Sequence, residues 1–316
     1  MTRHLCFLIY ADFVLFDLSG PLEAFNLARA LSGGAYRLTV ASLGGGLVRS
    51  SSGLEVMTVP FTDEAVDTLL VPGAPAPLDG PEVAGLAAAL AAARVRRCAS
   101  ICTGAFLLGR AGLLDGRQAT THWLGVPQLQ AQYPAACVEG DRIFVRDGAI
   151  WTSAGMSAGI DMALALIEDD LGAEVARTVA RLMVVYHRRP GGQNQFSALL
   201  ELDPASERIR RVLTHARDHL AEDLGVERLA EIAGLSVRQF SRVFAAACGM
   251  TPARAIERLR VEAACPRVED GRDSLEIIAR QHGFGDADRL CQAFLRVRGQ
   301  TPQEARRRAR LQALSR

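Results

Sequence analysis

The sequence predicts a flavodoxin-like α/β sandwich followed by an all-α domain of two helix-turn-helix units. Three observations predict this arrangement. Strand-like apolar runs alternate with helical patterns over the first 170 residues, strand-like runs stop after Leu171, and a helix-turn-helix pattern occurs twice near the C-terminus. A length of 316 residues suits two domains. We place the α/β domain at residues 1–190, a linker at 191–205 and the helical domain at 206–316.

The first domain is expected to contain a parallel sheet covered by helices on both faces. Alternating strands and helices joined by right-handed crossovers produce that arrangement. The expected strands are Leu5–Tyr10, Arg37–Leu43, Thr68–Pro72, Arg97–Ile101 and Arg142–Val145, and the expected helices are Pro21–Leu31, Pro81–Ala93, Gly104–Ala111 and Ala158–Leu171. A further helix over residues 173–187 should end at the Arg-Arg-Pro-Gly-Gly segment 188–192.

The first helix-turn-helix pattern begins at Val226. A short amphipathic helix, 226–233, is followed by Gly234, which can end a helix with a positive φ. Ser236 is a good N-cap for a second helix over 237–247, in which Phe240, Val243 and Phe244 share an apolar face.

The second pattern repeats this arrangement. Residues 274–281 form its first helix, 282–285 its turn and 286–296 its second helix, with Leu290, Phe294 and Leu295 on the apolar side. A connecting helix is expected over roughly 252–268, and Pro266 predicts a kink or an early end there, because proline removes a helix hydrogen bond.

The outward sides of the two second helices carry the candidate DNA-reading residues, Arg238, Gln239, Ser241, Arg242, Arg289, Gln292 and Arg296. Charge supports a double-stranded DNA partner for this half of the chain. Residues 206–316 hold 21 arginines and 15 acidic residues, whereas the remainder has an excess of acidic residues. The connecting helix would hold the two reading helices about one DNA turn apart, in successive major grooves.

Cys102 is the candidate ligand or reaction site of the first domain. It lies where an expected strand meets a helix, as in a nucleophile elbow, and the helix N-terminus is expected to lower its thiol pKa. Gly73 could supply a facing backbone donor, and Asp17 or Glu23 an acidic group. Thr103 and His122 complete the candidate pocket, although His122 is more readily interpreted as a structural residue than as an acid or base.

The helical domain resembles the AraC/XylS family. The resemblance rests on Leu229-Ala230-x-x-Ala233-Gly234-Leu235-Ser236, Gly249-Met250-Thr251-Pro252, Ile278-Ala279-x-x-x-Gly283-Phe284, and Phe294 followed by Gly299-Gln300-Thr301-Pro302. The first domain resembles the DJ-1/PfpI, class I glutamine amidotransferase-like superfamily. That resemblance rests on residues 99–108, 71–74, 16–23, 119–123, 152–155 and 189–193.

Together these resemblances imply a transcription regulator that senses a small molecule, often an activator. Two other interpretations stay open for Cys102: a hydrolase or hydratase, although Thr103 stands where protease-like relatives have His, and a thiol-based redox sensor. A DNA-binding protein without an effector is a further alternative. We expect a cytoplasmic homodimer with free thiols, possible contact with RNA polymerase, and no cofactor, metal or membrane partner, because the seven cysteines lack metal-ligand spacing.

Overall fold

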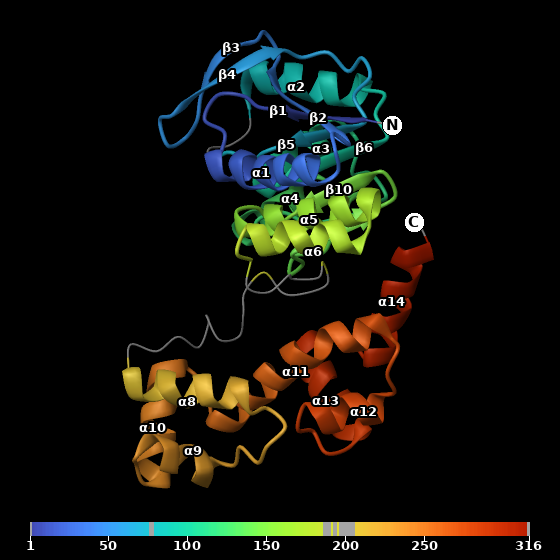
Figure 1. Ribbon diagram of the computed structural model, residues 1–316. Helices are drawn as coiled ribbons and strands as arrows, with labels where there is room; N and C mark the ends of the chain where they lie inside the picture. The colour runs from blue at the N-terminus through green and yellow to red at the C-terminus, as the bar shows by residue number, and fades with distance from the viewer. Residues whose placement is uncertain (1, 76–78, 186–190, 192–194, 196–205, 315–316) are drawn as a thin grey trace. The chain divides into compact units, whose positions relative to one another are not determined.

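A computed structural model describes residues 2–75, 79–185, 191, 195 and 206–314 (Figure 1). The chain divides into two compact units, residues 1–191 and 192–316. The expected linker at 191–205 and the helix-breaking segment at 188–192 lie almost entirely outside the described residues. No helix in the described parts of the chain combines the length and apolar character needed to cross a bilayer.

The first unit is a sheet of eight strands in the order β3-β4-β2-β1-β5-β6-β10-β9. The strands are β1 Arg3–Leu8, β2 Tyr36–Ser42, β3 Gly46–Arg49, β4 Glu55–Pro60, β5 Thr68–Val71, β6 Arg97–Ile101, β9 Phe144–Asp147 and β10 Ile150–Ser153. A separate short pair is formed by β7 Gln118–Ala119 and β8 Cys137–Val138.

The flavodoxin-like prediction is confirmed, but the sheet is mixed rather than purely parallel. The six inner strands are parallel, while edge strands β3 and β9 run antiparallel to β4 and β10. The sequence interpretation missed β3, β4 and β10. All four residues of β10 are buried, but β10 follows β9 so closely that the sequence pattern predicts a single strand there. The side chains of β3 and β4 are mostly exposed, so these strands lack the continuous apolar pattern of a buried strand.

Both faces of the sheet are buried, which follows from the continuous apolar sequence of its central strand. Side chains alternate between the faces of a strand. Leu5 and Phe7 join the core beneath α1 Leu15–Leu31, α5 Ser157–Leu171 and α6 Ala173–Leu182, whereas Cys6 and Leu8 join the core beneath α2 Gly80–Ala92 and α3 Ala105–Arg110. The remaining elements of this unit are η1 Cys102–Gly104, η2 Trp123–Gly125 and α4 Val126–Gln132.

Helix α1 begins at Leu15, six residues before the expected start. Pro21 therefore lies inside the helix, and it is buried. Proline is disfavoured in a helix interior, so the sequence pattern pointed to a start at this residue.

The second unit contains α8 Glu207–Asp218, α9 Val226–Ala233, α10 Val237–Cys248, α11 Pro252–Asp270, α12 Leu275–Gln281, α13 Ala287–Arg298 and α14 Pro302–Leu314. Its two cores share α11. The first core ends along this helix at Leu259, and the second begins at Val261. Each helix-turn-helix unit therefore has its own small hydrophobic core, with α11 belonging to both.

Helix α11 runs through Pro266 to Asp270, so the expectation of an early end was wrong. The residues around the proline explain why the helix continues. Cys265 and Val268 are buried in the second core, and their packing favours helical backbone on both sides of Pro266. Leu295 was also misassigned, because its side chain is 50% exposed rather than part of the core of α13.

Candidate ligand site and nucleic-acid interface

Cys102 lies at a sharp turn directly after β6. Its φ is +58°, an unfavourable conformation for a residue with a side chain, and η1 and α3 follow it immediately. The side chain is 7% exposed. This is the elbow geometry that the sequence predicts for this position.

Two glycines from other loops allow the backbone to close around the elbow. A Cβ on Gly155 would lie 2.2 Å from the Cβ of Cys102, and one on Gly73 would lie 2.5 Å from the Oγ1 of Thr103. Gly73 follows β5 and Gly155 follows β10, the neighbours of β6 on either side. The site is therefore built at the carboxyl ends of three adjacent parallel strands, where open α/β sheets bind their ligands.

Asp17 of α1 is fully buried beside the elbow and joins these loops. Its carboxylate accepts hydrogen bonds from the backbone N–H of Gly73 at 3.2 Å and from that of Met156 at 2.7 Å. The Cys102 thiol also hydrogen bonds to it. Burial raises the pKa of Asp17 to about 6, and the three hydrogen bonds limit the rise.

The thiol of Cys102 has a high pKa, which corrects the expectation of a lowered one. Burial, together with the negative charge of Asp17, raises the pKa of Cys102 to about 12, although a hydrogen bond from the backbone N–H of Thr103 acts in the opposite direction. The expected helix effect fails because α3 has only six residues and the sulfur is largely removed from water. The neutral thiol is therefore the form present near neutral pH.

The Thr103 hydroxyl bonds to the loop after β5 and holds it in place. Its Oγ1 accepts from the N–H of Ala74 at 2.8 Å and donates to the Ala74 carbonyl at 2.7 Å. The hydroxyl of Thr121 donates to the Cys102 carbonyl at 2.9 Å. These bonds fix the backbone around the sulfur of Cys102.

The other two candidate pocket residues are not joined to this cluster. His122 caps η2 by accepting from the N–H of Leu124 at 3.4 Å, and burial lowers its pKa. Within the described part of the chain, it makes no hydrogen bond to Cys102 or Asp17. Glu23 is exposed and accepts from the side chain of Asn26.

Sequence reasoning assigned no role to Met156 or Gly155. Met156 supplies the shorter hydrogen bond to Asp17 and has a φ of +52°. The Thr-Ser-Ala-Gly segment 152–155 was one of the family-like motifs, and it was the available signal that this loop belongs to the site.

In the second unit, α9 and α10 form the first helix-turn-helix. Gly234 ends α9 with a φ of +63°, and Ser236 caps α10 by accepting from the N–H of Gln239 at 3.4 Å. The side-chain carbonyl of Gln239 accepts in return from the backbone N–H of Ser236 at 3.3 Å, which completes a capping box. Arg238 and Arg242 are exposed on this helix and Ser241 is half-buried, while Phe240 and Phe244 are buried on the opposite side.

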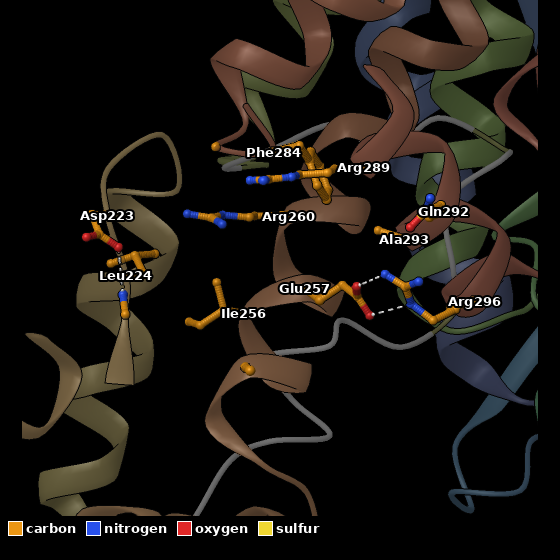
Figure 2. Close-up of a pocket in the computed structure, with 13 residues that line it drawn as sticks. Asp223, Leu224, Ile256, Glu257, Arg260, Phe284, Arg289, Gln292, Ala293 and Arg296 are labelled. Atoms are coloured by element: carbon orange, nitrogen blue, oxygen red, sulfur yellow. Dashed lines mark hydrogen bonds and ion pairs between the residues drawn. The ribbon is translucent and has the colours of Figure 1, made fainter. Parts of the chain in front are cut away.

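Helices α12 and α13 form the second helix-turn-helix. Asp286 caps α13 by accepting from the N–H of Arg289 at 2.8 Å. Arg289, Gln292 and Arg296 are exposed. Figure 2 shows the Arg296 guanidinium turned towards Glu257 of α11, to which it donates at 2.5 Å.

An α/β domain with an elbow cysteine, followed by two helix-turn-helix units, defines a DNA-binding transcription regulator. Residues 4–169 match the DJ-1/PfpI family model, and residues 229–308 match a helix-turn-helix domain model. The chain belongs to the DJ-1/PfpI family, among the members that carry an AraC-type DNA-binding domain and regulate transcription.

Similar proteins include both regulators and an enzyme. The HTH-type transcriptional regulator GlxA of Rhizobium meliloti is 30% identical over 314 residues, which cover 98% of this chain and 97% of that protein. Isonitrile hydratase of Pseudomonas putida is 35% identical over 194 residues, which cover 60% of this chain and 81% of the enzyme. The crystal structure of an AraC family transcriptional regulator from Pseudomonas putida aligns with a TM-score of 0.52 at 24% identity, covering 57% of this chain and 99% of its own, and shows the shared fold.

Proposed function

We propose that a small-molecule effector binds beside Asp17 and Cys102 and regulates DNA binding without being chemically converted. The observation that carries this proposal is the buried Asp17 carboxylate, which joins the loops after β5 and β10 next to the Cys102 thiol. A buried charged group is costly unless it is paired or hydrogen bonded, so the stability of this carboxylate depends on these partners. A ligand that alters these hydrogen bonds would act on two loops at once.

The protonation of the site favours binding over turnover. A nucleophilic cysteine reacts as its thiolate, and the pKa of Cys102 is raised to about 12. His122 makes no hydrogen bond to the sulfur within the described residues, so there is no Cys-His pair there to activate the thiol. The similarity to isonitrile hydratase keeps the enzyme alternative testable.

For DNA, we propose that α10 and α13 each enter a major groove. Arg238, Gln239, Ser241 and Arg242 would contact the first half-site; Arg289, Gln292 and Arg296 would contact the second. Exposure of these side chains, apart from the half-buried Ser241, supports the assignment. Arg296 would first have to leave Glu257.

We propose that the working form is a cytoplasmic homodimer, with RNA polymerase as a further partner where the protein activates transcription. Dimers place matching domains on repeated DNA sites. Light scattering of the full chain, alone and with DNA, measures the oligomeric state. A mass of one chain in the absence of DNA, and of one chain plus the DNA in the complex, would contradict the dimer.

A metabolite screen tests effector binding. Both tryptophans, Trp123 and Trp151, lie in the first unit, so their fluorescence follows unfolding of the sensing domain alone. An effector at a hundredfold excess over its dissociation constant should stabilise this domain by about 2.7 kcal/mol. Asp17→Asn should reduce that effect. If no metabolite in a broad panel stabilises the domain, the effector-free regulator is favoured instead.

Cys102→Ala separates binding from cysteine chemistry. We expect this variant to keep effector-dependent changes in DNA affinity, measured by gel shift. Product formation from a stabilising metabolite by the unchanged protein, lost in Cys102→Ala, would instead establish an enzyme. If the unchanged protein lost regulation only under oxidising conditions and Cys102→Ala did not, the redox sensor would be favoured.

A further inference from the structure

A groove of about 360 Å³ lies where the two helix-turn-helix units meet (Figure 2). The loop before α9 forms one side, α13 and the turn before it form the other, and α11 lies between them. Arg260 of α11 extends into this groove. Its neighbours along the helix, Leu259 and Val261, belong to different hydrophobic cores, so Arg260 lies at the boundary between the two units.

Arg260 binds the backbone of the first helix-turn-helix unit. Its Nε donates to the Leu220 carbonyl at 3.0 Å, and its Nη2 donates to the Glu222 carbonyl at 2.8 Å. Both carbonyls lie in the connection between α8 and α9. A guanidinium presents several donors in a rigid plane, so one side chain can hold two carbonyls of the same loop in a fixed position.

The turn of the second helix-turn-helix, between α12 and α13, packs against the same atoms. Gly283 has a φ of +75°, and a Cβ there would lie 2.1 Å from the Leu220 carbonyl oxygen and 2.6 Å from the Nη2 of Arg260. Gly234, the corresponding turn glycine of the first helix-turn-helix, has a φ of +63° and no atom within 4 Å of its added Cβ among the described residues. The close approach therefore distinguishes the second turn from the first.

We infer that Arg260 is a positioning residue that fixes the spacing of the two DNA-reading helices, and so selects the distance between two half-sites. Without this junction, the two helix-turn-helix units would be connected mainly through α11 and through the ion pair between the exposed Arg296 and the half-buried Glu257. An ion pair at the surface contributes little stability. The inference rests on the proposal that α10 and α13 both read DNA.

The test uses the full chain and an operator selected by it from random DNA. Affinities are measured for this operator, for versions with either half-site replaced, and for versions with one base pair added or removed between the halves. The unchanged protein should lose affinity by about tenfold or more in every altered operator, because each insertion rotates and shifts one half-site relative to the other. If replacing one half-site changes nothing, two-helix reading fails, whatever the role of Arg260.

Arg260→Ala should bind the selected operator about tenfold more weakly, yet lose less than about threefold on a spacing change, because its units can readjust. Arg260→Lys should retain part of the spacing preference, since an ammonium can still donate to one carbonyl. Arg267→Ala is the control on the same helix, because Arg267 bonds to Asp273 outside the groove. It should keep the normal spacing preference.

The two turn glycines provide a matched second comparison. Gly283→Ala should relax spacing preference as Arg260→Ala does, whereas Gly234→Ala should lower stability and leave the preference intact. Circular dichroism establishes which variants fold. If Arg260→Ala does not fold, Arg260→Lys and Gly283→Ala test the inference in its place. Unchanged spacing preference in folded Arg260→Ala, or in folded Arg260→Lys and Gly283→Ala together, would overturn the inference.

Discussion

Asp17 should make the sensing domain less stable as the pH rises from about 4 to 7. The pKa of its carboxyl is raised from 3.8 to about 6 in the folded domain. The folded state therefore holds its proton more tightly than the unfolded state. The stability from the bound proton is fully present below pH 3.8 and is lost as the pH rises through about 6. The difference between a pKa of 3.8 in the unfolded chain and about 6 in the folded domain corresponds to about 3 kcal/mol of folding stability at low pH.

The change is measured as a difference between the natural chain and Asp17→Asn. Asparagine does not titrate, but it leaves one of the N–H groups of Gly73 and Met156 without an acceptor, at a cost of about 1–3 kcal/mol. That cost is the same at every pH. We therefore expect the natural chain to lose about 2.4 kcal/mol relative to the variant between pH 4 and 7, because the unfolded carboxyl is already more than half ionised at pH 4.

Urea unfolding followed by tryptophan fluorescence gives the free energy of unfolding of this domain. His122 also has a pKa near this range, lowered by burial, but its contribution is common to both proteins and cancels in the difference. The Cys102 thiol does not titrate there, since its pKa is raised to about 12. A difference between the two proteins that stays constant from pH 4 to 7 would refute the assignment of Asp17.

Three other perturbations address the remaining features. Gly155→Ala should cost well over about 3 kcal/mol through its clash with the elbow, whereas Gly172→Ala, at the same φ of +87° with no atom within 4 Å in the described structure, should cost only about 1–3 kcal/mol; urea unfolding compares them. Ser236→Ala removes the capping box of α10 and should cost about 1 kcal/mol in thermal unfolding followed by circular dichroism; an unchanged midpoint would argue against the cap. Arg238→Ala or Arg242→Ala should weaken operator binding by about 1–3 kcal/mol if the side chain contacts a base, and retained affinity and sequence preference in both gel-shift titrations would contradict the placement of α10.

The position of the elbow could be predicted because the signals are local. A short apolar strand, Cys102 and a glycine-containing helix start follow one another directly in the sequence. The same is true of the first helix-turn-helix, where Gly234 and Ser236 define the turn and cap by their own conformational preferences. Local sequence was sufficient wherever backbone geometry decided the structure.

The high pKa of the Cys102 thiol could not be predicted, because it depends on how residues distant in sequence bury the sulfur. The loop containing Met156 and Gly155 lies more than 50 residues after Cys102, and Asp17 lies more than 80 residues before it. These segments enclose the sulfur and place a carboxylate beside it. The helix-end effect was a sound local argument, but burial outweighed it.

The two turn glycines illustrate the same limit in the DNA-binding domain. Both are followed by an apolar residue, and both adopt a positive φ. Of the two, Gly283 alone packs against another segment in the described structure, because the loop containing Leu220 returns to that turn and not to the turn at Gly234. Sequence pattern predicts the conformation of each glycine, whereas the neighbour across the chain determines what its replacement would disturb.

Regulation requires that effector binding favour one arrangement of the molecule over another. Met156 gives the proposed effector site a direct link to such a change, because it bonds to Asp17 and immediately precedes α5. Helix α5 packs against α6, the last helix described before the segment that leads to the DNA-binding unit. A ligand that competes for the Asp17 carboxylate would release a residue held at a φ of +52° and thereby alter the start of α5. On this argument, the binding energy of the effector acts on the helix pair nearest in sequence to the DNA-binding domain, and Cys102 contributes the neutral wall of the site rather than a reactive group.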